Sequence, residues 1–295
     1  MKAYVFPGQG SQFPGMGLSL YNDNVIAKHY FELADKILDF SISKVMFYGS
    51  EEDLKQTKIT QPAIFLHSTI LIETMREQFH PDMVAGHSLG EFSALVANKT
   101  LSFEDGLKLV YQRAMAMQQA CELHNTTMVA VVGRNLLINK VEEICSQATE
   151  CVVVANYNAP SQIVISGSVK GIDSIIDRFT DEANAKHTVR LNVGGAFHSP
   201  FMETARTRLA KAIEDTPFSQ PICPIYQNCT GKASTDITLI KQNLINQLTS
   251  PVLWTQSVSN MIADGADQFI EVGPGKVLQG LVQKIDADVY TEGIV

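Results

Sequence analysis

The sequence GHSLG at residues 86–90 constrains the fold more than any other feature of this chain. An apolar run at 82–85 precedes it and a helical pattern at 91–97 follows it, which together predict a strand, a tight turn and a helix. In such a turn the serine, here Ser88, has a strained main chain and an exposed hydroxyl, and the flanking glycines let strand and helix approach closely. The N–H of Leu89, at the start of the helix, then points toward any oxyanion formed at Ser88. GxSxG alone also occurs in ordinary loops, so it is the flanking elements that favour a nucleophile.

Composition and charge are those of a globular protein. The chain has 295 residues, 45% hydrophobic and 18% charged, and its net charge of −8 argues against a general affinity for nucleic acid or anionic membranes. Its five cysteines form no CxxC pair and no zinc-finger spacing with histidine, so we expect reduced thiols. The N-terminus reaches proline and glycine before a signal-peptide region could form, and no apolar stretch approaches the roughly 20 residues of a membrane helix. We therefore expect a soluble cytoplasmic protein.

The order of the expected elements indicates an α/β protein with a parallel sheet covered on both faces. A strand over 3–6 leads into a glycine-containing loop over 7–12. The other elements expected in this part of the chain are helices over 25–38, 61–78, 103–123, 200–213, 237–248 and 255–264, a strand over 268–272, and a last helix after GPGK at 273–276.

Between residues 127 and 192 the pattern changes to β-α-β-β-α-β. The expected elements are strands over 128–132, 151–156, 162–166 and 186–192, helices over 135–146 and 169–182, and a turn over 157–161. This order is typical of a ferredoxin-like unit, which can close a small core of its own. We therefore predict an α/β-hydrolase-like domain formed by residues 1–126 and 193–295, a ferredoxin-like subdomain over 127–192, and a substrate cleft between them.

A serine hydroxyl needs a base to take its proton, and His198 is the best candidate among the seven histidines. It lies where the chain leaves the expected subdomain, after a loop of small residues and just before a helix, which fits a general base. The alternative is a structural histidine near an N-cap formed by Ser199. We expect the side chain of His87 to point away from Ser88 and to pack. Residue order alone leaves six carboxylates open as the group that orients the base: Glu203, Glu214, Asp215, Asp236, Asp264 and Glu271.

Arg113 is flanked by alanine and methionine in a helix with few charges. Two interpretations stay open: an arginine with a solvated tip, or a guanidinium that presents its planar fork to a substrate carboxylate in an apolar pocket.

The glycine-containing loops do not match phosphate-binding motifs. A GxGxxG motif starting at Gly8 would need glycine where Phe13 stands. A Walker A motif starting at Gly10 would need lysine where Met16 stands, and one ending at Lys276 would need glycine where Ile270 stands. The loop after the first strand remains a good second source of oxyanion N–H groups.

Five motifs together resemble the malonyl-CoA:acyl carrier protein transacylase family of bacterial fatty-acid synthesis. They are FPGQGSQ at 6–12, GHSLGE at 86–91, QR at 112–113, GAFHS at 195–199 and VGPGK at 272–276, and the resemblance covers residues 6–281. It implies an acyltransferase without a cofactor or metal of its own, because malonyl-CoA and holo-acyl carrier protein carry the phosphopantetheine. The malonyl group would pass to the serine as an ester and then to the carrier thiol, with ping-pong kinetics.

The resemblance also implies a role for each candidate residue. The roles are nucleophile for Ser88, base for His198, oxyanion N–H donors for Gln9 and Leu89, and partner of the malonyl carboxylate for Arg113.

Three further residues follow from the same comparison with the family, and a fourth, Phe197, follows from its position beside the expected base. Gln247 falls where the family places a glutamine whose carbonyl orients the histidine, so the orienting group is neutral. Phe197, bulky and next to the expected base, should narrow the pocket at the malonyl α-carbon. Asn156 and Asn158 match a family turn at the cleft, and we expect structural roles for them.

The expected partners are acyl carrier protein and the coenzyme A thioester, with no nucleic acid and no membrane, and the chain is expected to be a monomer. Three alternatives stay open. The first is an acyltransferase that loads polyketide synthase carrier proteins, which shares every motif. The second is a serine thioesterase or esterase, which expects the order Ser…Asp/Glu…His and leaves the inserted subdomain unexplained. The third is a catalytically inactive carrier-protein scaffold.

Overall fold

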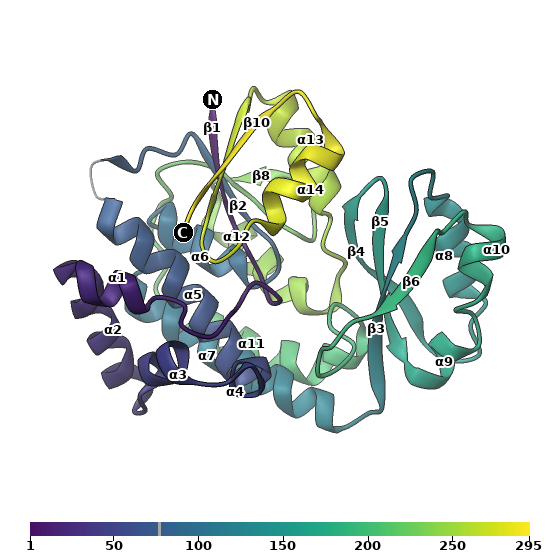
Figure 1. Cartoon of the computed structure of the whole chain (residues 1–295), viewed down its shortest axis with the longest axis horizontal. Helices are drawn as coiled ribbons and strands as arrows, with labels where there is room; N and C mark the ends of the chain where they lie inside the picture. Colours follow the sequence, from purple (N-terminus) through teal and green to yellow (C-terminus); the bar gives the residue numbers. More distant parts are fainter. Residues whose placement is uncertain (76–77) are drawn as a thin grey trace.

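The computed structural model describes residues 1–75 and 78–295, and its strands form two separate sheets (Figure 1). The larger sheet has the order β10-β9-β1-β2-β7-β8, and all its neighbours are parallel except the pair β7–β8. Its strands are β1 (Lys2–Phe6), β2 (Met83–Gly86), β7 (Ile225–Tyr226), β8 (Ala233–Ser234), β9 (Gln268–Val272) and β10 (Tyr290–Ile294). Because β1 lies between β2 and β9, the loops that leave these three strands meet at one edge of the sheet, the usual place for a ligand in such folds.

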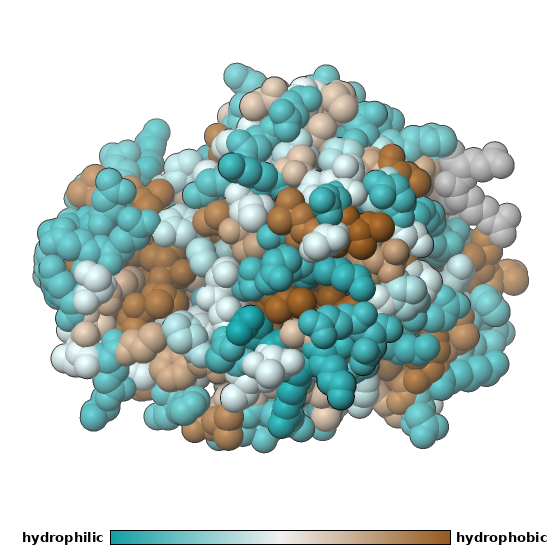
Figure 2. All heavy atoms as spheres, turned by 180° about the vertical axis from the view of Figure 1, so that it is seen from behind, coloured by the Kyte–Doolittle hydropathy of each residue, from teal (hydrophilic) through white to brown (hydrophobic). Residues whose placement is uncertain are grey.

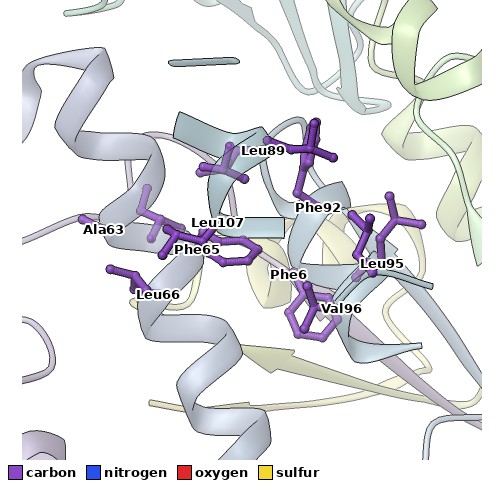
Figure 3. Close-up of a cluster of buried hydrophobic side chains, with 14 of the residues drawn as sticks. Phe6, Ala63, Phe65, Leu66, Leu89, Phe92, Leu95, Val96 and Leu107 are labelled. Carbon is purple, nitrogen blue, oxygen red and sulfur yellow. The ribbon is translucent and has the colours of Figure 1, made fainter. Parts of the chain in front are cut away.

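Helices cover the larger sheet on both faces. They are α1 (Leu18–Asp23), α2 (Val25–Leu38), α3 (Ile42–Tyr48), α4 (Glu51–Lys55), α5 (Thr57–Met75), α6 (Gly90–Ala97), α7 (Phe103–Glu122), α11 (Glu203–Asp215), α12 (Ile237–Asn246), α13 (Trp254–Ala263) and α14 (Val277–Ile285), with the 3-10 turns η2 (Pro200–Met202) and η3 (Gln247–Thr249). Figure 3 shows part of the core, in which side chains of β1, α5, α6 and α7 meet, among them Phe6, Phe65, Phe92 and Leu107. This packing fixes α6 directly behind the turn that carries Ser88.

The smaller sheet confirms the predicted ferredoxin-like order of elements. Its strands, all antiparallel neighbours in the order β4-β5-β3-β6, are β3 (Thr126–Val132), β4 (Val152–Ala159), β5 (Gln162–Ser168) and β6 (His187–Arg190). The helices α8 (Ile138–Ser146), α9 (Val169–Asp173) and α10 (Arg178–Glu182) lie on its outer side (Figure 1).

Alternating side chains of β3 serve two different cores. Val129 and Val131 pack under the outer helices in a core that belongs to the small sheet. Met128 and Ala130 belong to the main core and face the larger sheet. This period of two is that of a strand buried on both faces. The side chains of β3 on the inner face therefore join the small sheet to the main core.

Several predicted boundaries were wrong. Residues 157–159, expected in a turn, belong to β4, which is irregular there and turns only at 160–161. The helix expected over 169–182 is divided into α9 and α10, and the Ser174 hydroxyl donates to the carbonyl of Gly171 at the break. The helix expected over 61–78 begins earlier, at Thr57, and residues 76–77 of that prediction lie outside the described residues. The helix expected over 200–213 begins as η2, and α1, α3, α4, β7, β8 and β10 were not predicted.

The surface is mixed in character. Hydrophilic residues cover most of the face in Figure 2, and hydrophobic residues show between them in separate patches. None of the helices within residues 1–75 and 78–295 combines the length and the hydropathy needed to cross a membrane.

Candidate active site

Ser88 lies in the predicted tight turn, between the end of β2 and the start of α6. Its φ of 53° is in the left-handed region that residues with a Cβ rarely adopt. The neighbouring glycines are required by space: a Cβ on Gly86 would lie 1.9 Å from the carbonyl carbon of Gly90, and one on Gly90 would lie 2.0 Å from the oxygen of Phe6. The turn therefore presents the hydroxyl at the carboxyl end of the sheet, as the sequence predicted.

The amide of Asn228, in the loop after β7, holds this strained turn. Its Oδ1 accepts from the N–H of Ser88 at 2.6 Å, and its Nδ2 donates to the carbonyl of Gly86 at 2.6 Å. The Gly86 carbonyl is buried and the Ser88 N–H is partly buried, so both would otherwise be main-chain groups without a partner. Asn228 was not predicted, because one asparagine in a polar loop gives no signal in the sequence.

His198 faces the serine. Its Nε2 lies 2.8 Å from Ser88 Oγ, and its Nδ1 lies 2.9 Å from the main-chain oxygen of Gln247. A carbonyl oxygen only accepts, so Nδ1 carries the proton and the Nε2 lone pair faces the hydroxyl. Burial, with the nearby Arg113 cation, lowers the pKa of His198 to about 3, so the ring is neutral and able to take a proton from Ser88.

Arg113, on α7, is fully buried, and this excludes the solvated arginine that the sequence left open. One terminal nitrogen donates to Gln61 Oε1 at 2.7 Å, and the other donates to Ser88 Oγ at 3.1 Å and to Gln247 Oε1 at 3.0 Å. Burial lowers the pKa of Arg113 to about 10, so it remains a cation at neutral pH. Its Nε–H has no partner among the described residues. A cation with a free N–H beside the serine suits an anionic group on a substrate.

Gln247, in η3, orients the imidazole through its main chain rather than its side chain. Its Nε2 donates to the carbonyl of Ser88 at 2.9 Å and to Glu91 Oε2 at 3.0 Å. Of the six carboxylates that residue order left open, four are engaged elsewhere: Glu203 with Arg206, Asp236 with the start of α12, Asp264 with Tyr226 and Glu271 with the start of α14. The other two, Glu214 and Asp215, are exposed at the end of α11.

A cavity of about 310 Å³ opens beside Ser88 and His198. It is lined by the loop after β1, which includes Gln9, by Phe197, by apolar residues of α14, and by residues of β3, β4 and β5. It therefore lies between the two sheets, and its volume suits a small acyl group with part of its carrier arm.

His87, Asn156 and Asn158 also line this cavity. The ring of His87 packs 5.5 Å from that of Trp254, and its Nε2 lies 2.8 Å from Asn158 Oδ1, in agreement with the packing role expected for it. Both asparagines lie in β4, Asn156 within the strand expected over 151–156 and Asn158 in place of the turn expected over 157–161. Among the described residues there is no cluster of three or more side chains of histidine, cysteine, aspartate or glutamate suited to a metal ion.

The family model described as "Acyl transferase domain" matches residues 3–292. The chain belongs to the acyl transferase domain family.

Similar proteins cover nearly all of this acyl transferase. The malonyl CoA-acyl carrier protein transacylase of Bacillus subtilis (strain 168) is 39% identical over 291 residues, which are 98% of this chain and 92% of that protein. The crystal structure of MCAT from Streptococcus pneumoniae has a TM-score of 0.93 and 38% identity, and it covers 100% of this chain and 96% of its own. The malonyl-transacylase in the PlMCAT:AntF complex, which holds a type II PKS acyl-carrier protein, has a TM-score of 0.95 and 31% identity over 99% of this chain and 95% of its own.

Two further polar residues of this acyl transferase were missed at the sequence level. Glu91 lies in the first turn of α6 with its carboxylate fully buried, and Gln61 of α5 accepts from Arg113. Glu91 is part of the GHSLGE motif, so the sequence could have drawn attention to it. Gln61 sits in a long apolar helix and gave no signal of its own.

Proposed function

We infer that this acyl transferase moves the malonyl group of malonyl-CoA to the phosphopantetheine thiol of holo-acyl carrier protein, as an [acyl-carrier-protein] S-malonyltransferase of fatty-acid synthesis. The relatives that match it over nearly its full length carry this activity in their names. The observation that carries the proposal is the position of Ser88 Oγ, 2.8 Å from the neutral imidazole of His198 and 3.1 Å from the guanidinium of Arg113.

In the first half-reaction Nε2 of His198 takes the proton of Ser88 Oγ as that oxygen attacks the thioester carbonyl. The N–H groups of Gln9 and Leu89 bind the oxyanion that forms on the carbonyl oxygen. When the carbon–sulfur bond breaks, the imidazolium returns the proton to the sulfur and coenzyme A leaves. The malonyl group is then an ester of Ser88.

In the second half-reaction the carrier thiol gives its proton to His198 and attacks the ester carbonyl. The same oxyanion forms again, the bond to Ser88 Oγ breaks, and the proton passes from the imidazolium to the serine oxygen. A neutral orienting group, the carbonyl of Gln247, suffices for the first half-reaction, because a thiolate leaves with far less help than an amine.

Arg113 selects the acyl group. A malonyl carboxylate would pair with the buried guanidinium, while an acetyl group would leave that cation without its anionic partner. Phe197 lines the cavity beside Ser88 and His198 and would limit branching at the malonyl α-carbon.

We also propose a domain organisation, a cellular compartment and an oligomeric state for this enzyme. Residues 1–126 and 193–295 form the catalytic domain and residues 127–192 a subdomain that closes the acyl cavity, which is supported by the separate core of the smaller sheet. All five cysteines are free thiols, which supports a reducing, cytoplasmic compartment. We propose that the enzyme acts as a monomer, because this chain itself supplies the nucleophile, the base and the guanidinium that the reaction uses.

A polyketide carrier protein is the second candidate acceptor, because a structure with a TM-score of 0.95 holds a type II PKS acyl-carrier protein. Malonyl transfer from malonyl-CoA to each purified holo-carrier distinguishes the two. We expect ping-pong kinetics and a higher kcat/KM with the fatty-acid carrier. A preference for the polyketide carrier would reassign the pathway, and malonyl-CoA hydrolysis at the same rate with and without a carrier would replace transfer with a thioesterase activity.

A further inference from the structure

Glu91 is a buried carboxylate to which the catalytic cycle above gives no task. Its side chain is 0% exposed, one helical turn from Ser88, and three N–H groups converge on its oxygens. Gln227 Nε2 donates to Oε1 at 3.0 Å, and the main-chain N–H of Asn228 and Nε2 of Gln247 both donate to Oε2 at 3.0 Å.

These contacts identify the ionised form. A protonated carboxyl needs an acceptor for its O–H, whereas the three groups bonded to the Glu91 oxygens are all donors. Burial raises the pKa of Glu91, and the three donors together with the Arg113 cation oppose that rise by stabilising the carboxylate. The site thus contains one buried anion and one buried cation, joined by an amide.

That amide belongs to Gln247. Its NH₂ group is shared between the carbonyl of Ser88 and the Glu91 carboxylate, and its oxygen accepts from Arg113. If the amide were rotated by 180°, its oxygen would face two acceptors and its NH₂ group would face the guanidinium, so all three hydrogen bonds would be lost. Glu91 therefore helps to fix which end of the amide faces Arg113.

We propose that Glu91 is a positioning residue for substrate selection: its carboxylate locks the Gln247 amide, and the amide holds the Arg113 guanidinium beside Ser88. The inference rests on the proposed function, because it requires Arg113 to receive the malonyl carboxylate. It assigns Glu91 no contact with the substrate. Its effect reaches the reaction only through the cation, so it should alter the choice between malonyl and acetyl groups more than the chemistry common to both.

The test compares the rates at which malonyl-CoA and acetyl-CoA acylate the full chain. Glu91→Met keeps the length of the side chain and removes both acceptor oxygens. We expect Glu91→Met to lower the malonyl/acetyl rate ratio by about tenfold. When Gln247→Ala is already present, adding Glu91→Met should lower the ratio by less than about threefold, because the amide that Glu91 orients is then gone. Glu271→Met is the matched control, since Glu271 is also buried and accepts N–H groups, from the start of α14. It should lower stability and leave the ratio unchanged.

A merely structural Glu91 would give a different result. Equal losses of both rates in Glu91→Met, an unchanged ratio, or independent effects of Glu91→Met and Gln247→Ala on the ratio would overturn the inference. If Glu91→Met does not fold, Gln247→Ala alone tests the inference. An unchanged malonyl/acetyl ratio in Gln247→Ala would show that the amide does not position Arg113 for substrate selection. Arg113→Ala distinguishes a failure of the proposed function from a failure of the role of Glu91. An unchanged malonyl/acetyl ratio in Arg113→Ala would overturn the pairing of Arg113 with the malonyl carboxylate. A lowered ratio in Arg113→Ala together with an unchanged ratio in Glu91→Met would overturn only the role of Glu91.

Discussion

At the scale of the residue, the chemistry converges on one oxygen atom. Ser88 Oγ can donate to the lone pair of His198 Nε2 while it accepts from Arg113. Both neighbours are in the protonation state that the reaction needs, because burial keeps the imidazole neutral and the guanidinium retains its proton. The same burial supports the proposed role of Arg113 in selecting the acyl group, since a cation in a dry site gains much from an anionic partner.

Arg113→Ala should remove malonyl selectivity. Losing a buried charged partner costs about 2–5 kcal/mol, so malonyl transfer should fall about 30-fold or more while acetyl transfer stays or rises. Steady-state transfer from the two coenzyme A thioesters measures the ratio. Arg113→Lys keeps the charge without the planar fork, and its malonyl/acetyl ratio should lie between those of the wild type and Arg113→Ala. A ratio equal to that of the wild type in Arg113→Ala would contradict the role of the guanidinium.

Phe197→Ala should widen the cavity at the acyl group. The ring is buried and lines the cavity next to His198, so its removal should increase the use of methylmalonyl-CoA relative to malonyl-CoA by several-fold. Competition between the two thioesters measures this preference. Phe201→Ala is the control, because Phe201 lies outside that cavity. If Phe197→Ala leaves the preference as it is, the ring does not limit branching.

At the scale of the element, the strand, turn and helix around Ser88 depend on two glycines. A Cβ on Gly86 would lie 1.9 Å from the main chain of Gly90, where no side-chain adjustment can relieve the clash. We expect Gly86→Ala to lower the free energy of unfolding by about 3 kcal/mol or more. Urea denaturation measures this. Gly280→Ala in α14 is the control: its Cβ would meet nothing within 4 Å, so it should be neutral or stabilising. Equal stabilities of the two variants would show that the turn tolerates a side chain.

Elements with strong local patterns could be predicted from the sequence, and elements defined by distant partners could not. The GHSLG turn, α2 and β9 were found close to their true bounds because periodicity and glycines mark them. The two-residue β7 exists through its pairing with β2, and no pattern that short is visible in a sequence. β4 continues through Asn158 because Tyr157 and Ala159 still pair with β5, and because the main chain of Tyr157 also bonds to the distant residues Val252 and Thr255. These distant contacts leave no pattern in the local sequence.

At the scale of the whole molecule, the site is assembled from segments far apart in the chain. Reasoning from the residues alone pointed to Ser88 and His198 and left the orienting group open, and the resemblance to a family added Gln247. The structure brings these three residues together. Asn228 escaped both routes, and Glu91, although part of the GHSLGE motif, was given no role by either. Their importance lies in three-dimensional hydrogen bonds across more than 130 residues, and single residue types carry no trace of such contacts.

Buried histidines should make the stability of the molecule depend on pH. Burial lowers the pKa of His67 to about 4 and that of His198 to about 3, whereas in the unfolded chain both titrate near 6.5. Their contribution is complete above pH 6.5 and is lost as the pH falls toward 4, with a slope of up to about 1.4 kcal/mol per pH unit for each histidine.

Replacing one of these histidines isolates its contribution to the pH dependence of the free energy of unfolding. Urea denaturation of the wild type and of His67→Leu between pH 7.5 and 4.5 should give a free energy of unfolding that falls less steeply in the variant. His187→Gln changes an exposed histidine and should follow the wild type. Parallel slopes for the wild type and His67→Leu would contradict a neutral, buried His67.

The most direct test of the central claim is the mass of the intact protein after exposure to malonyl-CoA, followed by peptide mapping. The wild type should gain one malonyl group on the peptide that contains Ser88 and lose it when holo-acyl carrier protein is added, and Ser88→Ala should gain none. A malonyl adduct of full occupancy on Ser88→Ala, or an adduct mapped to another residue, would contradict the assignment of Ser88 as the residue that carries the acyl group.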